Sequence, residues 1–209
     1  MTSYGGQMSS DRLPAVRSSY RMARNARTSA MRSILRYVPA VPLPLETPRL
    51  HIRSFTLQDA PALHERVFGD PEAMKFIPRG ASPSVERTRD SVERFIRHER
   101  EHGFGLWAVE LKETGELIGD CGLFLVQGTG PEVEVAYHFG KAWWGQGIAT
   151  EAAAACLGYG FRECGLSEII AICFPEHVAS RRVMEKAGMR YVGPARYYDL
   201  DLVKYNKNR

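Results

Sequence analysis

The chain has 209 residues, of which 44% are hydrophobic, so it can bury a core and is not disordered throughout. Its formal net charge of +4 is unevenly placed: residues 1–45 hold seven arginines and one acid, whereas residues 46–209 hold 21 basic and 23 acidic side chains. The second part is mildly acidic, which argues against a nucleic-acid-binding surface there. We therefore expect a basic, flexible extension over residues 1–45 and one globular domain over residues 46–209.

The extension is rich in arginine and serine and ends in the extended stretch "VPAVPLP". Three interpretations stay open for it. It can be an organelle transit peptide, a basic arm that contacts a polyanion, or a stretch before a true start at Met22 or Met31. We expect a cytoplasmic protein, with organelle targeting as the alternative.

The cysteines and the hydropathy pattern exclude several classes of protein. The four cysteines contain no C-x-x-C pair and lie in apolar stretches, so we expect buried thiols and neither a disulfide framework nor a metal site. No apolar run approaches the ~20 residues that a bilayer span needs. We therefore expect no membrane partner.

Periodicity predicts alternating strands and helices from Thr47 onward. "RLHIRSF" alternates as a strand does, and residues 56–68 carry a helical apolar pattern. A helix capped by Ser82 should run to Gly103. Three strands follow at 105–111, 116–126 and 132–139, and the "KETG" between the first two predicts a hairpin and antiparallel pairing.

A glycine-containing loop then precedes a long apolar helix. "GKAWWGQG" leads into a helix over 148–164, a strand over 168–174 and a helix over 176–188. Glycines let a backbone approach a ligand closely, and the first turn of a helix presents unpaired N–H groups, so the loop is suited to a phosphate. It is not a P-loop, since Ile148 follows Gly147, and Thr150 stands where a dinucleotide fingerprint needs glycine.

In this order and spacing, the motifs resemble those of the GNAT superfamily of acetyl-CoA-dependent N-acetyltransferases. "WGQGIA" resembles the family loop Q/R-x-x-G-x-G/A, with Trp144 in place of the usual first residue. "WWGQGIATEA" and "EVEVAYHF" are most similar to the ribosomal-protein N-terminal (alanine) acetyltransferase branch, and "HVASRRVMEKAGM" resembles the family's last motif. The resemblance implies an α+β fold with a mixed, mostly antiparallel twisted sheet of about six to seven strands, flanked by helices and splayed in the middle to admit CoA.

The resemblance also implies roles in binding acetyl-CoA. The loop should hold the pyrophosphate through backbone N–H groups, and the strand before it should pair with the pantetheine arm. His177 stands where the family usually has asparagine, and Ser180 matches a position near the thioester. The expected cofactor-binding residues are Tyr137, His138, Phe139, Gly145, Gln146, Gly147, Ile148, Ala149, Thr150, His177 and Ser180.

The expected catalytic residues are Glu134 and Ser180. Glu134 matches the family's acidic strand position and can take a proton from the amine directly or through water. Strand alternation places it on one face with Glu132 and His138, which are weaker candidates. Met184 stands where many members have a tyrosine that protonates the departing thiolate, so water or Ser180 would serve instead.

The implied activity is acetyl transfer to a primary amine by direct attack in a ternary complex. A protein N-terminal α-amino group is the favoured acceptor, with a polyamine, amino acid or aminoglycoside as alternatives. A non-catalytic acyl-CoA-binding protein and a polyanion tether through the arm remain competing hypotheses. The protein is expected to be a monomer or homodimer. Tyr197 and Tyr198 can line the acceptor pocket or pack between strands, with packing favoured, and His51, His64, His98 and His102 are expected at the surface.

Overall fold

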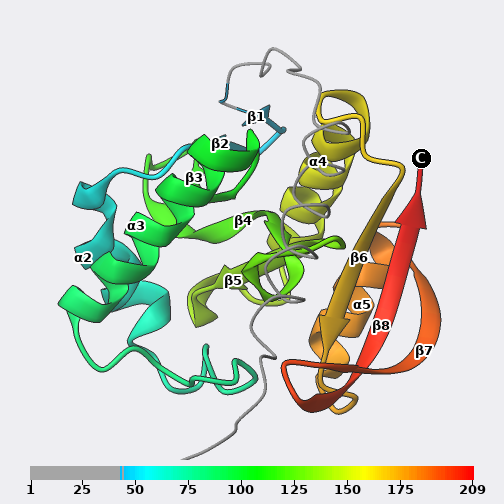
Figure 1. The fold of residues 1–209 in the computed structure, drawn as a ribbon. Coiled ribbons are helices and arrows are strands. Elements are labelled where there is room, and N and C mark those ends of the chain that lie inside the picture. The colour runs from blue at the N-terminus through cyan, green and yellow to red at the C-terminus, as the bar shows by residue number, and fades with distance from the viewer. Residues whose placement is uncertain (1–42, 44) are drawn as a thin grey trace, which may run out of the picture. The chain divides into compact units, whose positions relative to one another are not determined.

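The computed structural model describes residues 43 and 45–209, so the predictions for the extension lie almost wholly outside the described residues. The described residues form one unit around an eight-stranded sheet of order β1-β2-β3-β4-β5-β6-β8-β7 (Figure 1). The strands are β1 (Leu45–Glu46), β2 (Leu50–Arg53), β3 (Leu106–Leu111), β4 (Leu117–Leu125), β5 (Val133–Phe139), β6 (Glu168–Cys173), β7 (Arg190–Tyr197) and β8 (Leu200–Asn208). The α-helices are α2 (Ala60–Leu63), α3 (Val85–His102), α4 (Ile148–Arg162) and α5 (Val178–Lys186).

The sheet is antiparallel except where β5 meets β6. These two strands are parallel and are joined through α4, as a parallel pair requires. They pair only at Glu134 and Ile170, and beyond this point the strands separate. The predicted splayed α+β fold is therefore confirmed.

The structure differs from the prediction in the number of strands and in the residue that caps α3. The two-residue β1 adds an edge strand, and the C-terminal residues form a β7–β8 hairpin, giving eight strands rather than six or seven. Ser82 does not cap α3. Ser84 takes that position, because its extended backbone directly precedes the helix and its hydroxyl accepts the Arg87 N–H at 3.4 Å.

Helices cover both faces of the sheet, and the sequence of β3 shows why. Leu106 and Ala108 point to one face and join the core formed with α2 and α3. Trp107 points to the opposite face, where its ring meets Tyr159 of α4 edge-on at 5.1 Å. Burial on both faces explains why the first four residues of β3, "LWAV", are all apolar.

Three of the four cysteines are buried free thiols, as the apolar surroundings predict, and Cys164 is half-buried. Within residues 43 and 45–209, no helix is long and apolar enough to cross a membrane.

His98 lies in the core rather than at the surface, so the sequence prediction for it is wrong. Its Nδ1–H donates to the Phe104 carbonyl at 3.0 Å, and its Nε2 accepts the Leu125 N–H at 3.2 Å. Only a neutral imidazole, with its proton on Nδ1, can make both of these hydrogen bonds. Burial, followed by repulsion from His102, lowers the pKa of His98 to about 4.

We expect His98 to make the folded domain sensitive to acid. Between pH 6.5 and about 4 the unfolded chain holds a proton on this ring that the folded chain does not, so the free energy of unfolding falls as pH falls through this range. The total loss is on the order of 3 kcal/mol. Urea unfolding of the wild type and His98→Gln between pH 7 and 4 measures it. The variant should be less stable at pH 7 and show a shallower pH dependence, whereas equal slopes would contradict the assignment.

Candidate active site

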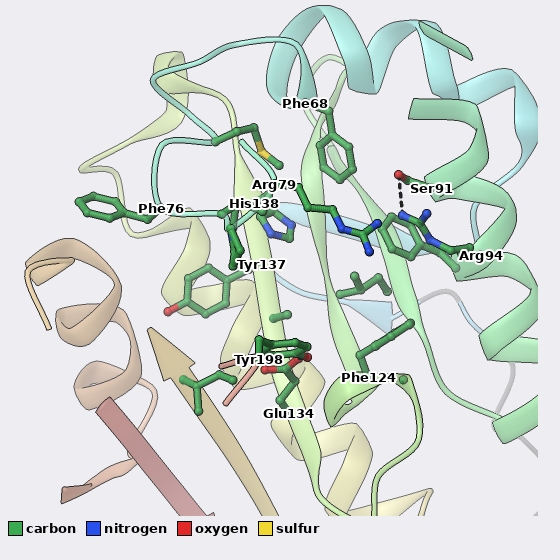
Figure 2. Close-up of a pocket in the computed structure, with 18 of the residues that line it drawn as sticks. Phe68, Phe76, Arg79, Ser91, Arg94, Phe124, Glu134, Tyr137, His138 and Tyr198 are labelled. Carbon is green, nitrogen blue, oxygen red and sulfur yellow. Dashed lines mark hydrogen bonds between the residues drawn. The ribbon is translucent and has the colours of Figure 1, made fainter. Parts of the chain in front are cut away.

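A pocket of about 830 Å³ lies between α3, the segment before it, the β4–β5 strands and α5 (Figure 2). Its walls are aromatic on one side, with Phe68, Phe95 and Phe124, and polar where β5 and α5 meet. The pocket extends to Tyr137 and Ser180, beside the opening between β5 and β6. The pocket therefore reaches the free edge of β5, where β6 has separated from it.

Glu134 lines this pocket and has a dedicated hydrogen-bond partner. The Tyr198 hydroxyl, from the turn between β7 and β8, donates to Glu134 Oε1 at 3.1 Å and accepts the Gln127 N–H at 3.0 Å. Burial raises the pKa of Glu134 to about 7, and the Tyr198 hydrogen bond opposes this rise. A carboxyl group with a pKa near neutrality suits a general base.

Tyr198 thus lines the pocket, and the favoured packing interpretation is wrong for it. The chain presents Tyr198 through a tight turn in which Tyr198 and Asp199 both have positive φ, 53° and 60°. Such a two-residue turn matches the twist of a hairpin. Tyr197 donates to Glu132 Oε2 at 2.8 Å instead.

His138 also lines the pocket, four residues after Glu134 on the same face of β5. Its Nδ1 lies 2.9 Å from Oδ1 of Asp120, which is completely buried. Burial lowers the pKa of His138, but attraction to Asp120 and their hydrogen bond outweigh it, so this pKa is raised. The fold therefore favours the protonated form of His138 more than water favours it for a free histidine.

The Asp120 partner was not predicted from the sequence, although a signal existed. Asp120 is the acid inside the otherwise apolar "LIGDCGLFL" of β4. A carboxylate buried in such a strand needs a partner, and the neighbouring strand supplies His138 through the register of β4 and β5.

The register of β5 decides which backbone groups face the opening. The Glu132 carbonyl accepts the Val126 N–H, and the Gly140 N–H donates to Ile118, so even-numbered residues direct their backbone groups to β4. Odd-numbered Tyr137 and Phe139 direct theirs to the edge where β6 has separated. The backbone contact to pantetheine that was expected of His138 does not fit this geometry. Tyr137 and Phe139 fit it, except that the Phe139 carbonyl accepts the Trp144 indole N–H at 2.7 Å.

The glycine loop ends at the start of α4, as predicted. Gly145 and Gly147 have positive φ, 76° and 78°, a conformation that glycine adopts without strain. Gly147 caps α4, with no side chain bound to the first helical N–H groups among the described residues. The N–H groups of Ile148, Ala149 and Thr150 are thus available to an anion. The Ile148 side chain itself is buried and anchors the helix start.

Arg49 lies beside this loop, a feature that sequence analysis missed. Its Nη1 donates to the Gln146 carbonyl at 2.9 Å, and its Nη2 lies 2.7 Å from Oε2 of Glu151 in the first turn of α4. The nearest atom to a Cβ added at Gly147 would be Arg49 Nη2, at 3.6 Å. Arg49 joins the turn before β2 to the loop, and no local sequence pattern links positions so far apart.

Ser180 and His177 lie on the α5 side of the pocket. Ser180 is buried, and its Oγ lies 2.9 Å from the hydroxyl of Tyr137 (Figure 2). The same hydroxyl lies 3.1 Å from the Ser180 carbonyl oxygen. His177 stacks on Phe76 with ring centroids 4.1 Å apart. Met184 lines the pocket one turn after Ser180. Burial raises the pKa of Tyr137, so its phenol stays protonated.

All predicted site residues except Phe139 fall into two groups. Glu134, Tyr137, His138, His177 and Ser180 line the pocket, whereas the loop residues 145–150 lie outside its wall, at the start of α4. Phe139 lies at the end of β5, outside the pocket wall. Glu132 belongs to neither group, because Lys204 lies 2.6 Å from its carboxylate and Tyr197 binds its other oxygen.

The fold, the splayed strand pair and the loop at the start of α4 define an acetyltransferase of the GNAT type. Residues 49–190 match the family model described as the acetyltransferase (GNAT) domain, and the chain belongs to this family. It is an N-acetyltransferase, and enzymes of this family use acetyl-CoA as the acetyl donor.

Similar proteins include uncharacterized protein YkkB of Bacillus subtilis (strain 168). It is 35% identical over 164 residues, covering 78% of this chain and 94% of that protein. The solved GNAT-family acetyltransferase from Bacillus anthracis is 33% identical, with a TM-score of 0.68, covering 78% of this chain and 97% of that one. The ribosomal-protein-S5-alanine acetyltransferase from Vibrio fischeri has a TM-score of 0.67 at 18% identity, covering 79% and 96%, a likeness of fold alone.

Proposed function

We propose that this enzyme acetylates an α-amino group, with a protein or peptide N-terminus as the acceptor, by direct attack in a ternary complex. The observation that carries the proposal is Glu134, a carboxyl with a pKa of about 7 in a pocket that reaches the unpaired edge of β5. The branch resemblance in the loop sequence favours an N-terminal acceptor. A small amine such as an amino acid is the alternative acceptor.

The size of the proton-transfer demand supports an α-amino acceptor. Deprotonating an α-amino group at pH 7 costs about 1 kcal/mol, whereas a lysine side chain costs nearer 4 to 5 kcal/mol. Glu134 has a pKa close to that of an α-amino group, so it matches the smaller demand. It needs no further activation by a metal or a second base.

Other described residues would bind the acetyl donor and stabilise the charges that develop during the reaction. Acetyl-CoA supplies an activated thioester, and the N–H groups at the start of α4 would bind its pyrophosphate. The nitrogen of the amine forms a bond to the acyl carbon and gives its proton to Glu134, while the carbon–sulfur bond breaks. A backbone N–H on the free edge, from Tyr137 or Phe139, would stabilise the oxyanion. Ser180 would hydrogen-bond the departing thiolate, which takes its proton from solvent.

We expect Tyr198→Phe to move the pH profile of the enzyme. The Tyr198 hydroxyl donates to Glu134 and lowers its pKa, so removing that hydroxyl should raise the pKa further above its ordinary value. The acidic limb of kcat/KM should move to higher pH by about one unit. Tyr197→Phe, which removes a hydroxyl from Glu132 instead, is the matched control and should leave the limb in place. If the acidic limb stays in place in both variants, the group that titrates in the pH profile is not Glu134.

Release of free thiol from acetyl-CoA tests the function itself. The assay should use peptides with different N-termini, free amino acids, polyamines and aminoglycosides. Turnover with peptides would support the proposal. Turnover confined to small amines would identify a small amine, rather than a peptide N-terminus, as the acceptor. Tight acetyl-CoA binding without thiol release on any acceptor would indicate the non-catalytic alternative.

A further inference from the structure

The wall of the pocket formed by α3 and the segment before it carries several arginines. Arg79 comes from the segment before the helix, and Arg87, Arg94 and Arg97 come from α3. Asp90 and Glu101 lie on the same wall. The arginines outnumber the acids, although the domain as a whole is mildly acidic.

Three of these four arginines lack an acidic partner among the residues that the structure describes. Arg87 pairs with Asp90 at 3.1 Å, whereas Arg79, Arg94 and Arg97 form no ion pair with a described carboxylate. Arg94 instead donates from Nη2 to the Ser91 hydroxyl at 2.9 Å. Figure 2 shows the guanidinium groups of Arg79 and Arg94 directed toward one another within the pocket.

The positive charges of Arg79 and Arg94 act on one another. Burial lowers the pKa of Arg94 and the positive charge of Arg79 lowers it further, while Asp90 opposes this effect. Two guanidinium groups that face the same space present several N–H donors in planar arrays. This arrangement matches the oxygens of a carboxylate and disfavours a further cation.

The rest of the pocket places this pair opposite the candidate base. Phe124 and Ala136 pack against the apolar core between α3 and β5, and Glu134 and His138 lie on β5 (Figure 2). An acceptor that spans the pocket would thus meet a proton acceptor at one end, apolar surface in the middle and two cations at the other end.

We propose that Arg79 and Arg94 bind a carboxylate of the acceptor, so that the enzyme selects amines that also carry a negative charge. This inference rests on the proposed acetyl transfer and narrows its substrate class. A peptide N-terminus followed by an acidic side chain fits, as does a free amino acid. Polyamines and aminoglycosides do not fit, because their additional positive charges would meet two arginines.

Matched acceptor pairs test the charge requirement. One arm uses glycine, Gly-Gly and Gly-Gly-Gly, each against its primary amide, so that every acceptor amine is an α-amino group. The other uses the amidated peptides Ser-Glu-Ala and Ser-Gln-Ala, which distinguishes a peptide source of the carboxylate from a free amino acid. Spermidine is the cationic comparison. In the wild type, kcat/KM should favour the carboxylate member of the best pair by about 10-fold or more.

The arginine variants link this preference to the proposed residues. In Arg79→Gln/Arg94→Gln the carboxylate-to-amide ratio should fall to about 1, and Arg79→Lys/Arg94→Lys should restore part of it. Arg89→Gln, an exposed arginine of α3 outside the pocket wall, should keep the wild-type ratio. A wild type that prefers amides or spermidine, or a double glutamine variant with an unchanged ratio, would overturn the inference.

Calorimetric binding of the same pairs to the protein with CoA separates this inference from the proposed function. If no acceptor is turned over but carboxylates bind more tightly than amides through Arg79 and Arg94, the anion site stands and acetyl transfer to these amines fails. If carboxylates and amides bind equally, the anion site fails whatever the turnover shows.

Discussion

Glu134→Gln should lower kcat by about 10²- to 10⁴-fold, the range that removal of a general base typically produces. The substitution keeps the shape of the side chain and its contact with Tyr198, but the amide cannot accept a proton at neutral pH. The dissociation constant for acetyl-CoA should change less than about twofold, because Glu134 lies apart from the loop at the start of α4. Steady-state kinetics and calorimetry on the same preparation measure both quantities.

Glu132→Gln is the matched control for this variant. Glu132 lies two residues earlier, directly before β5, but Lys204 and Tyr197 occupy its carboxylate. Its loss should cost stability rather than turnover. If both variants keep kcat within about threefold of the wild type, the proton acceptor is another group, and His138 with Asp120 becomes the next candidate.

Gly147→Val should raise the dissociation constant for acetyl-CoA by about 10- to 100-fold. The φ of Gly147 is +78°, a conformation that costs a β-branched residue on the order of 1–3 kcal/mol. The first turn of α4 would relax away from this strain and misdirect the N–H groups that hold the anion. Calorimetric titration with acetyl-CoA measures the effect, and circular dichroism checks that the fold is retained.

Gly115→Val separates strain from ligand binding. Gly115 has a similar φ of +68° in the β3–β4 hairpin, and a Cβ there meets open space. It should lose comparable stability without weakening acetyl-CoA binding. An unchanged acetyl-CoA constant in Gly147→Val would remove the phosphate-loop assignment.

The sequence predicted what depends on local patterns. Apolar alternation located β3, β4 and β5, and glycine at the end of "GQG" located the start of α4, since both signals arise from neighbouring residues. The capping serine of α3 was misplaced by two positions, because Ser82 and Ser84 have the same side chain and only the backbone conformation of Ser84 decides between them.

Contacts that the topology creates could not be predicted in the same way. Tyr198 reaches Glu134 from 64 positions away, and Arg49 reaches Glu151 from 102 positions away, so no periodic pattern connects them. The sequence identified Glu134 through its place in a motif. Its raised pKa arises from burial in the folded domain, and its hydroxyl partner comes from the turn between β7 and β8.

The sheet consists of two half-sheets, β1–β5 and β6–β8. Only the Glu134–Ile170 pair joins them, so the backbone ladder between β5 and β6 is interrupted. Side chains take over part of the missing connection, since Lys204 and Tyr197 bind Glu132 and Tyr198 binds Glu134 across the gap. A pantetheine arm carries amide groups of the kind that a strand presents, so a bound donor would complete the ladder along β5. The acetyl donor would then be a structural part of the sheet as well as a reactant, and each turnover would end with the sheet incomplete again.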